Sequence, residues 1–213
     1  DKNIPYLGME KEDNPFLGFR AVRYCLDRKE MYKIQLRALI RASVFGKIKI
    51  MIPLVTCVNE LREVKALVED IKADLDRENI PYDKNISVGV MIETPAASEI
   101  ADLLAKEADF FSIGTNDLTQ YTMAVDRGNS KVAYLYSVYN PAVIRSIKRI
   151  ISAAANENII AGMCGEAAAD PLLTPLLISF GLKEFSVNAS SILRTRAQIA
   201  KWTKAEADKV ADE

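Results

Sequence analysis

Four residues that can carry out chemistry each follow a short apolar segment of the chain. Glu93 follows one such segment, Asn116 and Asp117 follow the next, and Cys164 follows a third. Two carboxylates on neighbouring strands can jointly hold Mg²⁺, which takes one or two carboxylates together with water and substrate oxygens. An amide can donate to a ligand oxygen, and a thiol can give or accept a proton. The four residues are therefore candidates for a metal-assisted site.

Each candidate also has a purely structural interpretation. Glu93 can cap a helix, Asp117 can pair with an arginine, and Cys164 can be a buried structural thiol. Asn116 lies in a Gly-Thr-Asn-Asp run, and asparagine is common in such turns. The residue types and their spacing leave these alternatives open.

Arg20 and Arg127 are candidates for anion binding. A guanidinium group can hold a phosphate or a carboxylate with two parallel hydrogen bonds. Most arginines, however, are solvated or ion-paired at the surface, so neither residue alone identifies a ligand.

The composition limits the kinds of chemistry and partner. The 213 residues include 28 Lys plus Arg and 29 Asp plus Glu, with a formal net charge of −1. This balance argues against nucleic acid or an anionic membrane as the main partner. The chain has no histidine. A Ser-His-Asp triad, a Cys-His pair and a His-based zinc site are therefore excluded within it.

Cysteine usage favours a reducing compartment. Cys25, Cys57 and Cys164 are odd in number and far apart, so they build neither a disulfide framework nor a CxxC motif. No apolar run approaches the roughly 18 residues that a membrane span needs. We therefore expect a cytoplasmic protein without membrane insertion.

Apolar segments alternate with helical patterns along the chain. A further strand is possible around Leu17 to Val22. The five clear strands are expected at Ile48 to Val55, Ile86 to Ile92, Phe110 to Ile113, Ile159 to Met163 and Phe185 to Val187. The helices are expected from an N-cap at Asn59 through Leu75, from Thr94 through Leu104, from Asn140-Pro141 onward, and from Thr174 to Gly181.

This alternation predicts an α/β fold with a parallel sheet, in which all strands end at the same edge. We favour a (β/α)8 TIM-type barrel, because no Gly-rich nucleotide-binding turn follows any strand. A barrel needs eight strands, so the chain is expected to be the C-terminal part of a barrel whose first two or three strands are missing. A single domain over residues 1–213 is expected, with 204–213 as a frayed tail.

Several motifs together resemble the phosphoenolpyruvate-binding barrel of Enzyme I of the bacterial sugar phosphotransferase system, within the family of phosphoenolpyruvate (PEP)-utilising enzymes. The resemblance covers essentially the whole chain. The motifs are Asn14-Pro-Phe-Leu-Gly-Phe-Arg20, Val90-Met-Ile-Glu93-Thr-Pro, the stretch from Phe110 to Thr122, Val125-Asp-Arg-Gly128 and Gly162-Met-Cys-Gly-Glu166.

The resemblance implies a role for each candidate residue. Glu93 and Asp117 match the two Mg²⁺-binding carboxylates. Asn116, Asp117 and Arg127 match substrate-binding groups, and Arg20 matches an arginine of the phosphate site. Cys164 matches the acid that protonates the enolate to give pyruvate.

The resemblance also implies partners outside the chain. The phosphoryl acceptor in the family is a histidine on a separate N-terminal domain, which passes the group to the phosphocarrier protein HPr. Further phosphate-binding arginines lie on preceding strands; Asp1-Lys2 resembles the end of one such segment. A homodimer is implied as well. The alternatives are the equivalent barrel of phosphoenolpyruvate synthase or pyruvate phosphate dikinase, and a non-catalytic PEP-sensing or dimerisation module.

Overall fold

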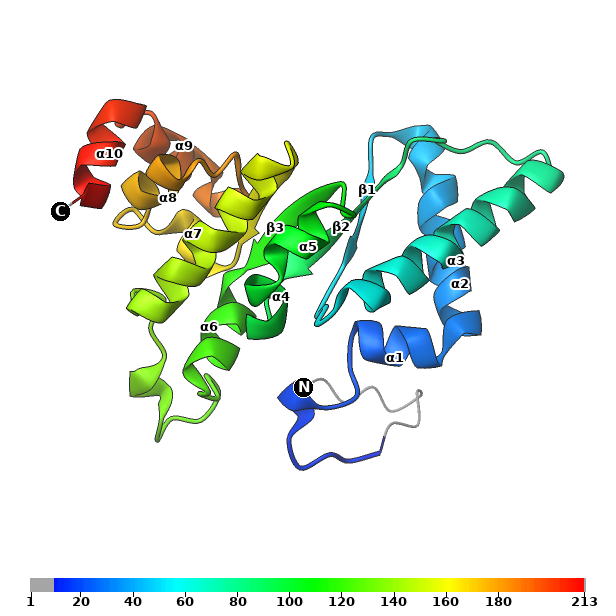
Figure 1. Cartoon of the computed structure of the whole chain (residues 1–213), viewed down its shortest axis with the longest axis horizontal. Helices are drawn as coiled ribbons and strands as arrows, with labels where there is room; N and C mark the ends of the chain where they lie inside the picture. The colour runs from blue at the N-terminus through cyan, green and yellow to red at the C-terminus, as the bar shows by residue number, and fades with distance from the viewer. Residues whose placement is uncertain (1–9, 213) are drawn as a thin grey trace. The chain divides into compact units, whose positions relative to one another are not determined.

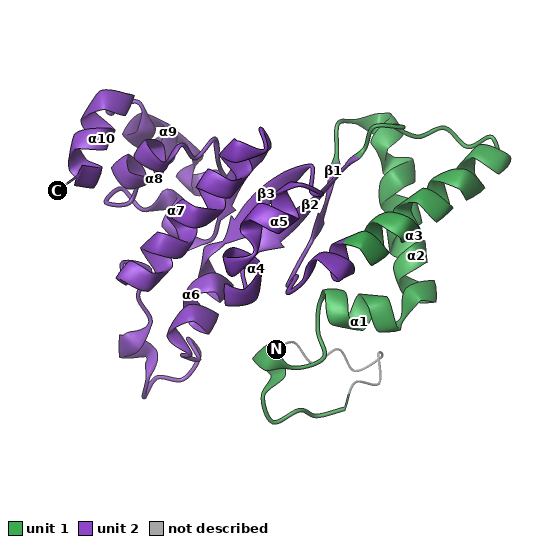
Figure 2. Cartoon of the chain, in the orientation of Figure 1, with its two compact units in different colours: residues 1–48, 62–86 green, residues 49–61, 87–213 purple. Residues whose placement is uncertain are grey.

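The structure is a computed structural model that describes residues 10–212. Asp1-Lys2 therefore lies outside the described residues. The chain divides into two compact units (Figure 2): unit 1 comprises Asp1–Ile48 and Arg62–Ile86, and unit 2 comprises Lys49–Leu61 and Ser87–Glu213. Helix α3, Val58–Arg77, runs from unit 2 into unit 1. A single domain over residues 1–213 stays a prediction.

All described strands belong to one parallel sheet in unit 2. Each strand pairs with the next one along the chain, in the order β1-β2-β3-β4-β5. The strands are β1 Lys49–Ile52, β2 Ser87–Ile92, β3 Phe110–Gly114, β4 Ile160–Cys164 and β5 Glu184–Phe185. The predicted α/β fold with a parallel sheet is confirmed, and all five expected strands are present within a few residues of their expected ends.

The strand order agrees with one wall of a barrel. Strands in a (β/α)8 barrel follow one another in sequence order, whereas an open doubly wound sheet reverses its order at a switch point. Within residues 10–212 the sheet is an open row of five strands without such a reversal. Closure by additional strands stays a prediction.

One face of the sheet packs against helices and forms the core of unit 2. Alternate strand residues point into this core, among them Ile52, Ile92, Ile113 and Met163, each fully buried. Figure 1 shows α4 Pro95–Glu99, α5 Ala101–Ala105, α6 Thr115–Met123 and α7 Pro141–Asn156 on this side.

Capping side chains set the helix starts that the sequence predicts. The Asn140 carboxamide accepts the Ala142 N–H at 2.9 Å, and the Thr94 hydroxyl accepts the Ala97 N–H at 3.1 Å. The helix expected from Thr94 to Leu104 is divided in two at Ile100, whose backbone leaves the helical region. Asn59 lies inside α3 rather than at its cap, because the Glu60 carboxylate instead accepts the N–H groups just before the helix.

The C-terminal part of unit 2 consists of short helices. They are α8 Thr174–Phe180, α9 Ile192–Ile199 and α10 Lys204–Asp212. Residues 204–212, expected as a frayed tail, form helix α10, which buries Ala207 and accepts a hydrogen bond from Ser179 through Asp208 at 2.7 Å. Across residues 10–212, every helix is too short or too polar to cross a membrane.

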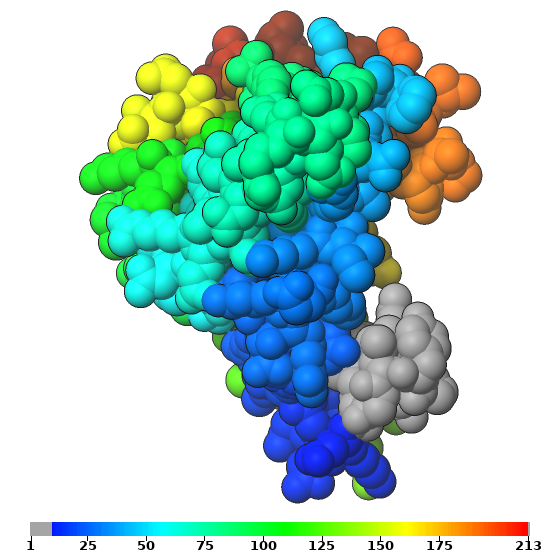
Figure 3. Space-filling model, turned by 90° about the vertical axis from the view of Figure 1, so that its right-hand side faces the viewer, coloured from blue at the N-terminus to red at the C-terminus, as the bar shows by residue number. Residues whose placement is uncertain are grey.

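Unit 1 is built from helices. Its remaining elements are the 3-10 helix η2 Pro15–Leu17, α1 Val22–Asp27, α2 Lys29–Ala42 and η3 Ser43–Phe45. Helices α2 and α3 lie side by side (Figure 3) and are joined by ion pairs from Lys29 to Glu63 at 3.1 Å and from Arg37 to Glu78 at 2.6 Å.

The possible strand around Leu17 to Val22 is wrong. Pro15 starts a 3-10 turn instead, and helix α1 begins at Val22. The Phe19 N–H is donated to the Glu12 carboxylate at 2.8 Å, so it does not take part in a strand ladder.

We expect Gly89→Ala to destabilise unit 2. A Cβ atom at Gly89 would lie 2.5 Å from the Phe110 carbonyl oxygen and 2.5 Å from its ring, so two strands would have to separate. Overpacking of this kind costs about 2 kcal/mol in the free energy of unfolding. Urea denaturation measures this loss. Gly46→Ala is the control, because a Cβ atom there meets nothing within 4 Å; equal stability of both variants would contradict the packing argument.

Candidate functional site

The parallel sheet brings four of the predicted residues to one edge. Glu93 directly follows β2, Asn116 and Asp117 lie in the first turn of α6 after β3, and Cys164 is the last residue of β4. Strands β3 and β4 are in register with Gly114 opposite Cys164. The structure thus places Glu93, Asn116, Asp117 and Cys164 at the carboxyl ends of neighbouring strands, and their roles stay a prediction.

Glu93 is held as a buried carboxylate. Its side chain is only 6% exposed, and its Oε1 atom accepts the Leu54 N–H at 2.8 Å. A Cβ atom at Gly114 would lie 2.6 Å from Oε2, so only glycine at the end of β3 leaves room for this carboxylate. A carboxylate buried in this way needs charged or polar partners to offset the loss of solvent.

Asn116 connects the ends of β3 and β4. Its Oδ1 atom accepts the Glu166 N–H at 3.2 Å, which leaves the amide nitrogen as the donor toward a ligand oxygen. The neighbouring Thr115 hydroxyl donates to the Cys164 carbonyl oxygen at 2.8 Å. These two bonds fix α6 against the turn that follows β4.

Asp117 forms an ion pair with Arg127. The Nη1 atom of Arg127 lies 2.7 Å from Oδ1, with 35% of the arginine side chain and 14% of the aspartate side chain exposed. The Arg127 N–H is also donated to the Gln120 side chain at 3.1 Å. The structural alternative for Asp117, pairing with an arginine, is thus observed; a carboxylate has several lone pairs, so this contact still leaves it able to accept a further ligand.

Cys164 is half-buried at the end of β4. Burial raises the pKa of the Cys164 thiol, the nearby Ser112 hydroxyl lowers it, and the charges of Glu93 and Asp117 raise it further. The thiol therefore keeps its proton at neutral pH, as a proton donor requires.

Arg20 belongs to unit 1 and is not part of this edge in unit 2. Its guanidinium carbon lies 5.7 Å from the centre of the Phe16 ring. Its assignment to a phosphate site stays a prediction.

Sequence reasoning missed Tyr136. The Tyr136 hydroxyl donates to the Asn116 carbonyl oxygen at 3.2 Å. Burial raises the pKa of this hydroxyl group, and the charges of Arg127, Glu166 and Asp117 act on it, so it remains a donor at neutral pH. Tyr136 lies in the irregular segment 124–140 between α6 and α7, where no periodicity distinguishes it; only its position after the Asn-Asp pair could have suggested a role.

The donor chemistry fits Mg²⁺ better than a transition metal. Glu93 and Asp117 are hard oxygen donors, and the charges of both raise the pKa of the Cys164 thiol. Mg²⁺ is usually held by one or two carboxylates plus substrate oxygens. No group of three or more Cys, Asp or Glu side chains that could hold a metal occurs among residues 10–212. Glu93 and Asp117 could therefore supply only part of the ligand set of a Mg²⁺ ion, and the metal stays a prediction.

A family model for PEP-utilising enzymes, described as the PEP-binding domain, matches residues 1–204. The chain belongs to this family. It is 53% identical over 212 residues to the phosphoenolpyruvate-protein phosphotransferase of Geobacillus stearothermophilus, covering 100% of this chain and 37% of that protein. The enzyme of the same name from Bacillus subtilis is 52% identical over 208 residues, covering 98% and 36%. The chain thus spans little more than a third of the relatives' length.

Solved structures support the fold alone. A citrate lyase from Burkholderia xenovorans superimposes with a TM-score of 0.60 at 18% identity, covering 81% of this chain and 55% of that one. RipC from Yersinia pestis gives a TM-score of 0.54 at 13% identity, covering 80% and 71%.

We expect Tyr136→Phe to loosen the segment that carries Arg127. The variant loses the hydrogen bond to the Asn116 carbonyl oxygen, worth about 1 kcal/mol, so segment 124–140 should open about fivefold more often. Trypsin cleavage after Arg127 and Lys131 reports this opening. Tyr134→Phe is the control, because Tyr134 on the same segment is 79% exposed; equal cleavage of the two variants would show that the Tyr136 hydroxyl does not hold the segment.

Proposed function

We propose that this chain is the PEP-binding part of a phosphoenolpyruvate-protein phosphotransferase. The complete protein transfers the phosphoryl group of PEP to a histidine and releases pyruvate. The observation that carries this proposal is the convergence of Glu93, Asn116, Asp117 and Cys164 at one edge of the sheet. This edge offers carboxylates for a metal, a donor for the substrate and a proton source together.

Phosphoryl transfer depends mainly on positioning and on charge neutralisation. Glu93 and Asp117 would hold Mg²⁺, which supplies positive charge at the phosphoryl oxygens when bound. Arg127 adds a second positive group at this site, and the Asn116 amide donates to a substrate oxygen. Arg20 is assigned to the phosphate as well, on the basis of its motif.

Cys164 would complete the reaction after the phosphoryl group has left. Cleavage of the C–O–P linkage at phosphorus leaves the enolate of pyruvate, which needs a proton at its methylene carbon. The thiol of Cys164, whose pKa is raised mainly by burial, keeps that proton available at neutral pH.

The acceptor lies outside this chain, which has no histidine. We assign it to an N-terminal domain of the same protein, which then phosphorylates HPr. We also propose a cytoplasmic homodimer. The names of the relatives favour this function over the barrel of a synthase or dikinase. A non-catalytic sensing module would not need a proton donor such as Cys164 beside its ligand-binding groups, which argues against that alternative.

Labelled PEP tests the function directly in the complete protein. With Mg²⁺ present, we expect the label on a histidine and stoichiometric release of pyruvate. Asp117→Asn should reduce the transfer by more than about 100-fold, since even outer-shell substitutions at metal sites cost 10–100-fold. The control is Glu99→Gln, which removes an exposed carboxylate on α4 that pairs with Arg149. Absence of labelled histidine in the unsubstituted protein would refute the proposed function.

Cys164→Ala separates proton donation from substrate binding. We expect the affinities for Mg²⁺ and PEP, measured by isothermal titration, to stay within about twofold of those of the unsubstituted protein. The reason is that the Cys164 thiol is not among the groups assigned to bind either ligand. Pyruvate formation should slow by about 100-fold, the lower end of the usual contribution of a general acid. Cys57→Ala, at an exposed thiol after β1, is the control. Unchanged turnover in Cys164→Ala would remove this residue from the mechanism.

A further inference from the structure

Helix α6 carries Asp117 and Gln120 on one side, because residues three positions apart in a helix are neighbours on its surface. The chain leaves α6 through Ala124, whose backbone is left-handed with a φ of 53°, and turns back toward the helix. Arg127 is then bound to α6 at two points. Its Nη1 atom lies 2.7 Å from the Asp117 Oδ1 atom, and its backbone N–H is donated to the Gln120 Oε1 atom at 3.1 Å.

Gln120 binds the returning chain through both its main chain and its side chain. Its carbonyl oxygen accepts the Val125 N–H at 3.0 Å, and its Oε1 atom accepts the Arg127 N–H. Gln120 is 3% exposed and Val125 is 4% exposed. The turn that follows is closed by its own atoms, since the Gly128 N–H is donated to the Asp126 carboxylate at 2.7 Å. The Gln120 side chain therefore holds this turn, as a unit, against α6.

The contact with Arg127 fixes the orientation of the Gln120 amide. If the amide were turned over, its NH₂ group would face the Arg127 N–H, donor against donor. In the orientation present, the Gln120 Nε2 atom is buried and has no hydrogen-bond partner among residues 10–212. A buried donor without a partner destabilises a fold, and methionine would fill a similar space without one. Stability alone therefore does not account for glutamine at this position.

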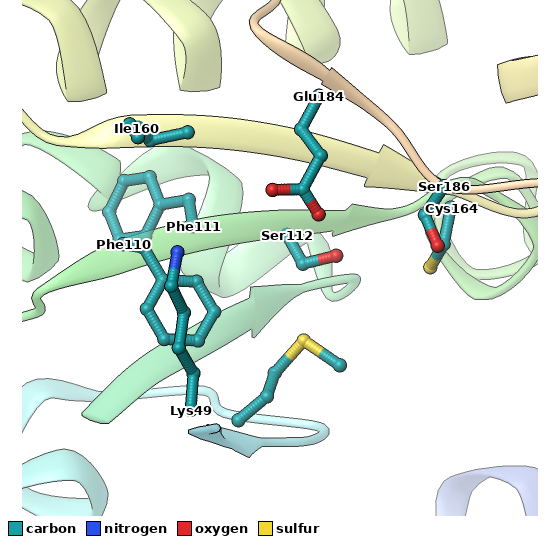
Figure 4. A pocket seen from close by; sticks show the side chains of 9 residues that line it. Lys49, Phe110, Phe111, Ser112, Ile160, Cys164, Glu184 and Ser186 are labelled. Carbon is teal, nitrogen blue, oxygen red and sulfur yellow. The ribbon is translucent and has the colours of Figure 1, made fainter. Parts of the chain in front are cut away.

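The hollow beside the sheet does not provide this support for Arg127. It has a volume of about 230 Å³ and borders the sheet face opposite the core, with Cys164 and Ser186 at one end (Figure 4). Among the residues that the structure describes, its lining includes Cys164 but no residue of α6 or of segment 124–140. The proposed proton donor and Arg127 are thus positioned by different elements, strand β4 and helix α6.

We propose that Gln120 is a positioning residue for Arg127. By anchoring the backbone of residue 127, it keeps the guanidinium group beside Asp117, where a phosphoryl oxygen of PEP would be bound. This inference rests on the proposed function of Arg127 as a PEP-binding group. Arginine has a long side chain with many rotamers, so a fixed backbone reduces the number of places that its charged group can occupy. Gln120 acts through Arg127 and needs no contact with PEP.

The first test needs no phosphotransfer. The complete protein, without Mg²⁺ or PEP, is treated with phenylglyoxal, and modification of Arg127 is followed by mass spectrometry. Gln120→Met is compared with Thr122→Val, a matched control on the same helix whose hydroxyl oxygen is also buried without a partner among the described residues. We expect Gln120→Met to speed the modification about fivefold, as the loss of one hydrogen bond gives in a local opening equilibrium. Exposed Arg194 and Arg196 should react unchanged.

The second test is a double-mutant cycle on phosphoryl transfer to histidine. Gln120→Met should lower kcat/KM for PEP by about tenfold, because a displaced charged group stabilises the reacting phosphoryl group poorly. In the Arg127→Ala background the same substitution should change kcat/KM less than about twofold, since the residue that Gln120 positions is gone. The midpoint of urea unfolding should be unchanged in Gln120→Met. A glutamine with a purely structural role would lower that midpoint and would reduce the activity equally in both backgrounds.

Three results would overturn the proposal: parental modification of Arg127 in Gln120→Met, an equal acceleration in Thr122→Val, or an undiminished effect of Gln120→Met in the Arg127→Ala background. If Gln120→Met does not fold, hydrogen exchange of the Arg127 N–H in the unsubstituted protein decides. Protection supports the anchor, and exchange at the rate of an unstructured amide contradicts it. Absence of labelled histidine in the unsubstituted protein would refute the proposed function, whereas the phenylglyoxal result would still test the anchor.

Discussion

The hydrogen-bonded register between β3 and β4 is the constraint on which the candidate site depends. It sets Gly114 opposite Cys164, and so it fixes how far the first turn of α6 stands from the thiol. The Glu93 carboxylate then fits against Gly114 because no side chain occupies that place. A slip of β4 by one residue would turn Cys164 to the other face of the sheet.

The polar residues at this edge differ in burial and in the charged groups around them. Glu93 is held by a backbone N–H group and is almost fully buried, which suits a ligand whose position must not vary. Asp117 is more exposed, and its carboxylate forms an ion pair with Arg127. Burial and the charges of Glu93 and Asp117 raise the pKa of the Cys164 thiol, so its environment favours giving a proton over acting as a nucleophile.

The sequence predicted the sheet and much of the site because both depend on local patterns. Apolar runs such as that ending at Ile92, and the Asn140-Pro141 helix start, are short-range signals that survive in the structure. The supposed strand around Leu17 failed because a side-chain contact from Glu12, invisible in the periodicity, takes a backbone donor. Tyr136 escaped notice for a similar reason: its hydroxyl group bonds to a residue 20 positions away.

The segment between α6 and α7 is hydrogen-bonded to the turns that follow β3 and β4. Tyr136 bonds to Asn116 after β3, and Tyr139 bonds to Asp170 after β4. Arg127 lies on this same segment and reaches back to Asp117. Any displacement of the segment must therefore change the surroundings of Asn116, Asp117 and Asp170 together. The segment between α6 and α7 therefore joins the turn that follows β3 to the turn that follows β4.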